Sequence, residues 1–162
     1  REQGAIRYTL VDEGSLVSYK TRQLSDLGLD EVRTKVEFFQ GDACNLKAQI
    51  TGFDLILAAN LIDRLYQPTE FLAEVHQRLN IGGVLMITSP YTWLEEHTRP
   101  ENWLGGFKKD GESYTTLDGL KNILNSHFRL MQEPQDVPFV IRETRRKYQH
   151  SLSEVTLWER IR

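Results

Sequence analysis

Several absences narrow the classes of protein to which this 162-residue chain can belong. Its single cysteine, Cys44, excludes an internal disulfide and a thiolate metal cage, and this fits a reducing cytoplasm. No apolar run approaches the roughly twenty residues that a membrane span requires, and no signal peptide is visible. A formal net charge of -3 gives no general attraction to nucleic acid. We therefore expect a cytoplasmic protein that binds neither membranes nor nucleic acid.

Basic tracts and metal ligands are also sparse. The only dense basic run, residues 145–147, is too short for a phosphate-binding track and is more typical of a solvated loop. The histidines are scattered without metal-ligand spacing, so we expect no metal site. Hydrophobic residues make up 40% of the chain and charged residues 27%, as in ordinary globular proteins. This composition predicts one compact domain over residues 1–162.

Three apolar runs predict strands in the first part of the chain. Residues 36–40 are β-branched and aromatic, and Gly41 and Asp42 end this run. Residues 53–61 are nearly all apolar, as in a central parallel strand that is buried on both faces. Residues 84–88 predict a further short strand that ends before Pro90.

A helix is expected between the last two of these strands. Pro68 suits a first helical turn, and the apolar residues that follow fall on one face. These are Phe71, Leu72, Val75 and Leu79. Gly82 and Gly83 are expected to stop the helix. A strand, a helix and a strand joined by short connections indicate a right-handed crossover in a parallel sheet.

The second half predicts a long loop, a helix and a terminal strand pair. Residues 91–114 are polar and aromatic, and loops of this length in compact domains are usually functional or disordered. Thr115 or Thr116 is expected to cap a helix, and residues 128–132 to form a strand. Residues 137–144 and 154–159 predict an antiparallel pair.

The start of the chain has weaker patterns. Residues 7–11 fit a strand or a helix end, and residues 16–27 predict a helix. Together the elements predict an α/β fold, a Rossmann-like three-layer αβα sandwich with a mostly parallel sheet and a C-terminal antiparallel strand. Ligands of such sheets bind outside the carboxyl ends of the strands, where Asp42 and Asn60 are expected.

Five stretches of the sequence resemble one enzyme family. They are VEFFQGDACNL, FDLILAANLIDRLYQP, RLNIGGVLMITSPYTWLEE, WLGGFKKDGESYTTLDGL and EPQDVPFVIRETRRKYQH. Together they resemble the carboxy-terminal methyltransferase domain of ovothiol-biosynthesis enzymes, from about Gly4 to Trp158. The resemblance implies a class I S-adenosylmethionine-dependent methyltransferase acting on 5-thiohistidine, also called 4-mercaptohistidine, at an imidazole nitrogen. It also implies a sulfoxide synthase domain as a fused or separate partner.

One departure from the family is large. The family opens with a strand and a glycine-rich turn that holds the methionine part of the cofactor, whereas no G-x-G precedes Val36. We therefore expect an N-terminally truncated sheet that lacks its first strand. The missing turn leaves open a non-catalytic methyltransferase-like module that serves only as an interaction surface.

The resemblance implies cofactor contacts at two strand ends. The expected cofactor-binding residues are Asp42, Ala43, Cys44, Asn60 and Leu61. Asp42 would bind the adenine side of the cofactor, although an Asp in a tight turn after a strand is common. Cys44 has no neighbouring base, so it is interpreted as a small apolar filler rather than a nucleophile. Asn60 is expected near the transferred methyl group, and a strand-ending cap is the alternative.

The expected substrate-binding residues are Asp63, Arg64, Tyr91, Trp93, Trp103, Phe139 and Arg142, with Asn60 and Tyr91 as the catalytic pair. Asp63 and Arg64 also fit an ordinary ion pair. The aromatic residues fit a lid that excludes water and favours a sulfonium, or simple packing of a long loop. Arg142 is the first choice for a substrate carboxylate, and a surface arginine is the alternative. Another small substrate on the same scaffold remains open.

Overall fold

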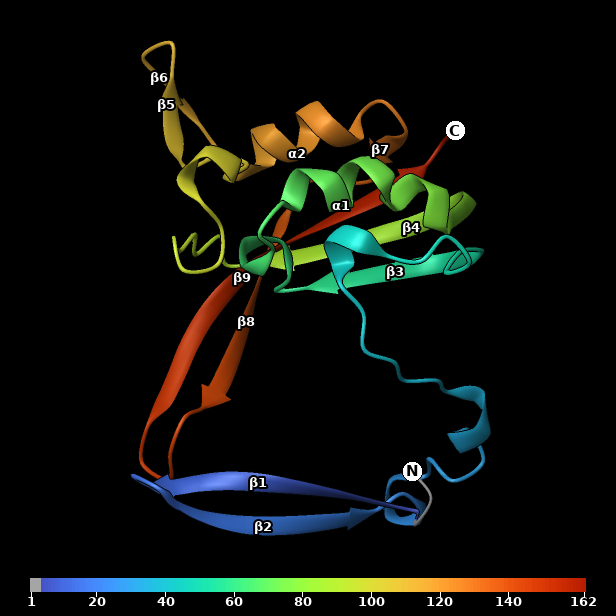
Figure 1. Ribbon diagram of the computed structural model, residues 1–162, viewed down its shortest axis with the longest axis vertical. Coiled ribbons are helices and arrows are strands. Elements are labelled where there is room, and N and C mark those ends of the chain that lie inside the picture. The colour runs from blue at the N-terminus through green and yellow to red at the C-terminus, as the bar shows by residue number, and fades with distance from the viewer. Residues whose placement is uncertain (1–3) are drawn as a thin grey trace. The chain divides into compact units, whose positions relative to one another are not determined.

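The computed structural model describes residues 4–162, which divide into two compact units. Unit 1 comprises residues 4–40 and Val140–His150, and unit 2 comprises Gly41–Phe139 and Ser151–Arg162. Figure 1 shows the elements of both units. Because the described residues divide into these two units, the single domain expected over residues 1–162 stays a prediction.

The structure contains strands and helices with the following bounds. The strands are β1 (Ala5–Glu13), β2 (Leu16–Gln23), β3 (Phe53–Ala59), β4 (Leu79–Ser89), β5 (Phe107–Lys109), β6 (Glu112–Tyr114), β7 (Phe128–Leu130), β8 (Gln135–Arg142) and β9 (Tyr148–Arg160). The α-helices are α1 (Pro68–Glu74) and α2 (Thr116–Leu124). Short 3₁₀ turns are η1 (Ser25–Leu27), η2 (Arg33–Lys35), η3 (Ala43–Asn45), η4 (Ile62–Arg64), η5 (Val75–Arg78) and η6 (Pro100–Asn102).

Unit 1 is built on an antiparallel hairpin of β1 and β2. The helix expected over residues 16–27 is wrong, because β2 occupies Leu16–Gln23 and only a 3₁₀ turn follows it. Gly14 makes the reversal at a φ of 55°, a conformation that glycine adopts without a steric penalty. Val17, Tyr19 and Thr21 then alternate along β2 with its other side chains, and β-branched and aromatic residues suit a strand.

The strand expected over residues 36–40 is also wrong, since this segment joins no ladder among the described residues. Phe38 and Phe39 are 78% and 65% exposed. An extended apolar segment becomes a strand only when another strand satisfies its backbone groups. The apolar pattern of residues 36–40 therefore predicted a strand that does not form.

The sheet of unit 2 has the order β3-β4-β9-β7, with β8 paired to β9. β3 and β4 are parallel, whereas β9 pairs antiparallel with both β4 and β7. The expectation of a mostly parallel sheet is therefore wrong, and the sheet is mixed. The cause is the insertion of β9 between β4 and β7, which themselves run in one direction. The expected C-terminal antiparallel pair is present as β8 and β9.

Among the described residues, α1 and α2 lie together on one face of this sheet (Figure 1). The expectation of a three-layer sandwich is therefore wrong for this part of the chain, which has one helical layer. β3 lies at the edge of the sheet, and Leu55 and Leu57 are 59% and 57% exposed. β3 is parallel to β4, as expected. The expectation that it is buried on both faces is wrong, because one of its faces is exposed.

Both helices begin where the sequence predicts. Pro68 occupies the first turn of α1, and Thr115 caps α2 through a reciprocal pair of hydrogen bonds with Asp118. Gly82 and Gly83 do not stop α1, because the helix ends at Glu74 and β4 already begins at Leu79. Leu79 is aligned with Phe53 of β3. Ladder pairing therefore ends the helical segment earlier than the glycines do.

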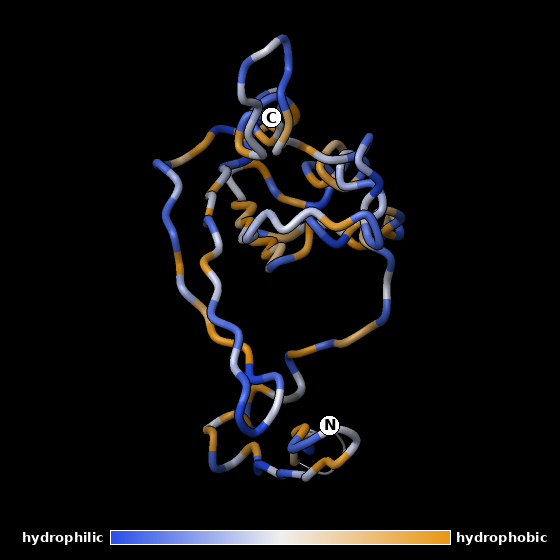
Figure 2. Tube along the Cα trace, turned by 90° about the vertical axis from the view of Figure 1, so that its left-hand side faces the viewer, coloured by the Kyte–Doolittle hydropathy of each residue, from blue (hydrophilic) through white to orange (hydrophobic). Residues whose placement is uncertain are grey.

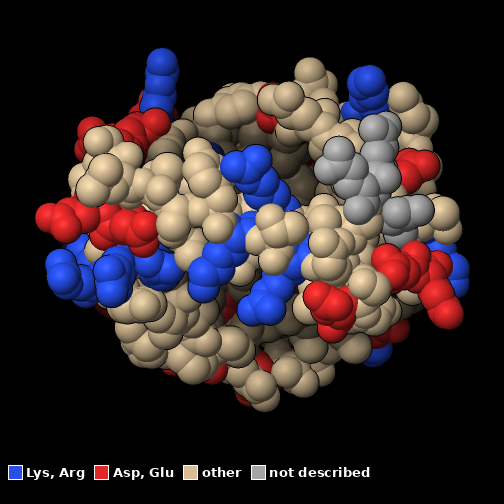
Figure 3. Space-filling model, turned by 90° about the horizontal axis from the view of Figure 1, so that it is seen from below, with Lys and Arg blue, Asp and Glu red and all other residues tan. Residues whose placement is uncertain are grey.

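The hydrophobic core lies between the sheet and the two helices. Its largest fully buried side chain is that of Trp158, packed with Leu85, Leu120 and Phe128 among others. Figure 2 shows apolar positions recurring along the strands and helices of this region. On the face in Figure 3, acidic side chains flank the basic ones, in keeping with a small net charge. No helix among residues 4–162 is long and apolar enough to cross a membrane.

Candidate active site

Polar side chains gather where β3 and β4 end. Asn60 follows β3, and Ser89 is the last residue of β4. β9 brings Ser153 and Glu154 to the same edge, since Glu154 is aligned with Ser89. Because successive side chains of a strand point to opposite faces, these residues form one polar group on each face of the sheet.

The first group is centred on Asn60. Its backbone N–H donates to the carbonyl oxygen of Thr88 at 2.8 Å, and its Oδ1 accepts from the hydroxyl of Ser153 at 2.7 Å. The φ angle of Asn60 is 47°, a left-handed conformation that asparagine tolerates better than most residues. Its Nδ2 has no partner among the described residues. Asn60 therefore offers a fixed amide with a free donor.

The second group, on the helix side, is centred on Ser89. The Ser89 hydroxyl donates to Asp63 Oδ1 and accepts from the backbone N–H of Tyr91, each at 3.0 Å. The Tyr91 hydroxyl donates to Glu154 Oε1 at 2.6 Å. Burial, and then this hydrogen bond, raise the pKa of Tyr91. Tyr91 is therefore a neutral hydrogen-bond donor rather than a base.

Asp63 and Arg64 form an ion pair, as one reading of the sequence anticipated. Asp63 is 1% exposed, and its Oδ2 lies 3.1 Å from Arg64 Nη1. Arg64 Nη1 also donates to the carbonyl oxygens of Asp63 and Thr92. A buried carboxylate requires such compensation. Whether either residue also contacts a substrate stays a prediction.

The turn after residue 41 forms a separate cluster around Asp42. Asp42 Oδ1 accepts from the backbone N–H of Cys44 at 2.9 Å, and its Oδ2 accepts from the Tyr66 hydroxyl at 2.8 Å. The Cys44 thiol donates to the carbonyl oxygen of Gln67 at 3.4 Å. Ala43 and Cys44 are half-buried against the core. Burial raises the pKa of the Cys44 thiol, in keeping with a filler rather than a nucleophile.

The aromatic residues of the long loop pack against their own surroundings. Trp93 Nε1 donates to the hydroxyl of Thr116, and Trp103 Nε1 donates to the carbonyl oxygen of Thr98. The two indole rings are stacked with centroids 6.4 Å apart. Both rings are therefore held in place by packing and hydrogen bonds. A role for Trp93 or Trp103 as a lid stays a prediction.

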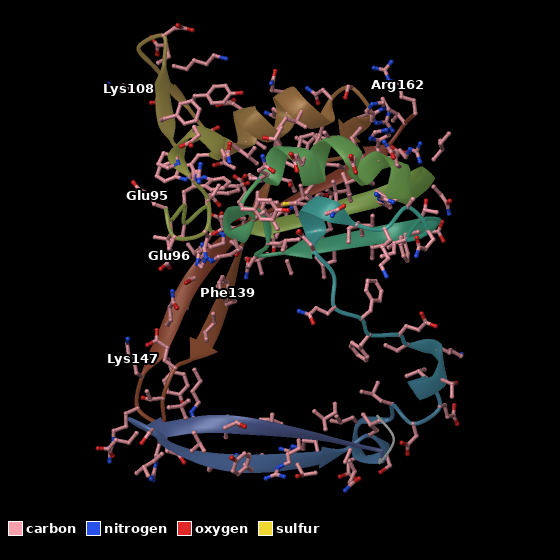
Figure 4. The ribbon with its side chains drawn as sticks, in the orientation of Figure 1. Glu95, Glu96, Lys108, Phe139, Lys147 and Arg162 are labelled. Carbon is pink, nitrogen blue, oxygen red and sulfur yellow. The ribbon has the colours of Figure 1, made fainter. Side chains whose placement is uncertain are left out.

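The last two candidates lie on β8. Phe139 is half-buried within unit 2 (Figure 4). Arg142 belongs to unit 1, where its guanidinium donates to Asp12 Oδ1 at 3.3 Å and to the carbonyl oxygen of Thr144 at 3.0 Å. Because Arg142 is partly neutralised by Asp12 and belongs to the other unit, its carboxylate-binding role stays a prediction.

Sequence reasoning missed Tyr66, Ser153 and Glu154. Tyr66 is 24 positions from Asp42, and no local pattern pairs them. Ser153 and Glu154 reach the strand ends only because β9 inserts next to β4. The sequence did predict an antiparallel strand that contains Glu154, but it does not give the register that aligns Glu154 with Ser89. No group of three or more potential metal ligands occurs among residues 4–162.

Comparison with solved structures gives the fold. A solved structure described as the conversion of a disulfide bond into a thioacetal group during echinomycin biosynthesis shares 15% identity at a TM-score of 0.52, and the match covers 84% of this chain and 62% of that one. A SAM-dependent methyltransferase from Methanosarcina mazei shares 15% identity at a TM-score of 0.48, covering 75% and 65%. The chain thus spans less than two thirds of the length of either neighbour.

Comparison with curated proteins finds no match. A family model described as a methyltransferase domain matches residues 7–150, which is most of the chain. This match favours an enzyme over the non-catalytic module left open by the sequence, and it implies S-adenosylmethionine as methyl donor. The chain therefore belongs to the methyltransferase domain family.

Proposed function

We propose that the protein is an S-adenosylmethionine-dependent N-methyltransferase acting on 5-thiohistidine (4-mercaptohistidine) in ovothiol biosynthesis. The observation that carries the proposal is the convergence of Asn60, Tyr91 and the Asp63–Arg64 pair at the carboxyl ends of β3 and β4. Ligands of α/β sheets bind at this edge. The thiohistidine substrate is supported by the five sequence stretches that resemble ovothiol-biosynthesis enzymes.

The residues present fit the adenine half of the cofactor. The exposed Asp42 carboxylate accepts hydrogen bonds, and an exocyclic amine donates them. Ala43 and Cys44 would flank the base, and Leu61 would add apolar contact beside Asn60. When bound, the cofactor supplies an activated methyl group on a positively charged sulfur.

The chain's own contribution to methyl transfer is positioning. Asn60 holds a free amide donor in a strained, fixed conformation, and Tyr91 is fixed by Ser89 and Glu154. Such fixed groups orient a reacting nitrogen for in-line displacement, where most of the rate gain comes from proximity. Asp63, Arg64, Phe139 and the two indoles would form the walls of the substrate site.

The test is methyl transfer by the purified natural protein that contains this sequence. With S-adenosylmethionine supplied, we expect 5-thiohistidine to gain the mass of one methyl group, whereas histidine, the matched control without the sulfur, does not. A thiohistidine of unchanged mass would remove the substrate assignment. Asn60→Ala should lower the turnover rate by a larger factor than it lowers the affinity for S-adenosylhomocysteine, the demethylated cofactor.

A different small substrate is the second candidate, because the ion pairs of Asp63 and Arg142 leave neither side chain fully free for a thiohistidine. A panel of amino acids and thiols in the same assay separates the two candidates. Cytoplasmic location, suggested by the lone cysteine, and a fused or partnered sulfoxide synthase domain belong to the same proposal.

A further inference from the structure

Tyr66 has a hydrogen bond that the proposed function does not use. Its hydroxyl donates to Asp42 Oδ2 at 2.8 Å, although Tyr66 is 49% exposed and could reach water instead. The other carboxylate oxygen, Oδ1, accepts from the backbone N–H of Cys44. Both oxygens of Asp42 are therefore held by protein donors from two different segments.

The backbone around Tyr66 is held by hydrogen bonds from neighbouring segments. Asn102 Nδ2 donates to the carbonyl oxygen of Tyr66 at 2.9 Å, and the Cys44 thiol donates to that of Gln67. Pro68 then begins α1, which fixes the chain direction directly after this segment. The Tyr66 ring is thus presented to Asp42 from a fixed backbone.

The two hydrogen bonds to Asp42 leave some of its acceptor positions unoccupied. A carboxylate offers about four lone-pair positions, and the bonds from Tyr66 and Cys44 occupy two of them. The remaining positions can accept from a ligand amine without breaking either bond. A fixed acceptor loses less conformational entropy on binding than a freely rotating one. The arrangement is that of a preorganised acceptor.

The protonation state of Tyr66 and the open space beside it are consistent with a preorganised Asp42. The hydrogen bond to Asp42 raises the pKa of Tyr66 to about 12, so the hydroxyl remains a donor at neutral pH. Tyr66 and Gln67 also line an open hollow of about 380 Å³, which Glu95 and Glu96 of the long loop border. Figure 4 shows these two acids projecting from that loop. The hollow thus lies beside the Tyr66 ring, and Asp42 itself is exposed.

We propose that Tyr66 is a positioning residue that orients the Asp42 carboxylate toward the exocyclic amine of the cofactor's adenine. The inference rests on the proposed function for the location of the cofactor, but it does not depend on which substrate is methylated. It predicts that removing the Tyr66 hydroxyl weakens selection for that amine rather than binding in general.

The experiment is calorimetric titration of the natural protein that contains this sequence. The ligands are S-adenosylhomocysteine and its analogue in which hydrogen replaces the adenine amine. We expect Tyr66→Phe to weaken S-adenosylhomocysteine binding by about three- to tenfold, the worth of one hydrogen bond, and the analogue by less than twofold. Tyr148→Phe is the matched control, because Tyr148 is exposed and its hydroxyl has no hydrogen-bond partner among the described residues.

A second variant separates positioning from folding. In an Asp42→Asn background, Tyr66→Phe should cause no further loss of S-adenosylhomocysteine affinity, and the melting temperature of ligand-free Tyr66→Phe should match that of the unmodified protein. Equal losses for both ligands, or unchanged affinity for S-adenosylhomocysteine, would overturn the inference. Absence of any binding by the unmodified protein would overturn it together with the cofactor site. Failure to methylate thiohistidine alone would leave it standing.

Discussion

The two faces of the unit 2 sheet differ sharply, although they are made by the same strands. Register places Ala58, Leu85, Ile87 and Trp158 on the face covered by the helices, and none of them is more than 1% exposed. Leu55 and Leu57 point to the opposite face and are more than half exposed. Both faces are apolar in sequence, so what covers a strand, and not its composition, decides where burial stabilises this fold.

The largest effect should come from a matched pair of truncations on the two faces. Leu85→Ala removes a fully buried side chain and should lower the free energy of unfolding by about 2–5 kcal/mol. Leu57→Ala, in the neighbouring strand, should change it by less than about 0.5 kcal/mol because the side chain is already exposed. Urea unfolding of both variants measures the difference. Similar losses would show that the second face is covered in solution.

A smaller effect should follow from crowding the helical layer. A Cβ at Gly119 of α2 would lie 1.9 Å from the carbonyl oxygen of Leu104, so this helix approaches the long loop too closely for any side chain. Gly119→Ala should therefore destabilise the protein by about 1–3 kcal/mol, the usual cost of overpacking. The control is Asn122→Ala on the exposed side of α2. Equal stability of the two variants would mean that the helix packs more loosely.

The smallest effect should come from the cap of the same helix. Thr115→Ala removes the two hydrogen bonds between the Thr115 hydroxyl and Asp118 and should cost about 1 kcal/mol, whereas the bond from the Thr115 backbone N–H to Asp118 remains. The Thr115 hydroxyl, and then its backbone N–H, hold the pKa of Asp118 below its ordinary value. This contribution is present above the unfolded pKa and is lost as the pH falls through the folded pKa. Thermal melts between pH 7 and 2 should show a flatter acid limb in the variant; an unchanged limb would contradict the cap.

Local patterns predicted the elements that depend on neighbours in sequence. The start of α1 at Pro68, the cap at Thr115 and the terminal antiparallel pair all follow from residues a few positions apart. The errors concern partners distant in sequence. Residues 36–40 have strand composition but pair with no strand among the described residues, and Leu16–Gln23 form the second strand of a hairpin where a helix was expected.

The candidate site divides in the same way. The sequence identified Asn60 and Tyr91 because each directly follows an apolar strand. It gave no sign of Glu154 or Tyr66, because their hydrogen bonds join positions 63 and 24 residues apart. Arg142 was chosen for its charge, and its bond to Asp12 across 130 residues could not be foreseen. The tertiary structure alone determines which of these side chains already have a hydrogen-bond or ion-pair partner.

The half-buried state of Cys44 has a consequence for redox chemistry. Because burial, followed by the charge of Asp42, raises the pKa of the thiol, only a small fraction is thiolate near neutral pH. The thiolate is the form that attacks disulfides and peroxides. The only sulfhydryl of this chain is thus poorly suited to form mixed disulfides, even among small thiols that oxidise readily. The turn that contains Asp42 would keep its geometry as the surrounding redox potential changes.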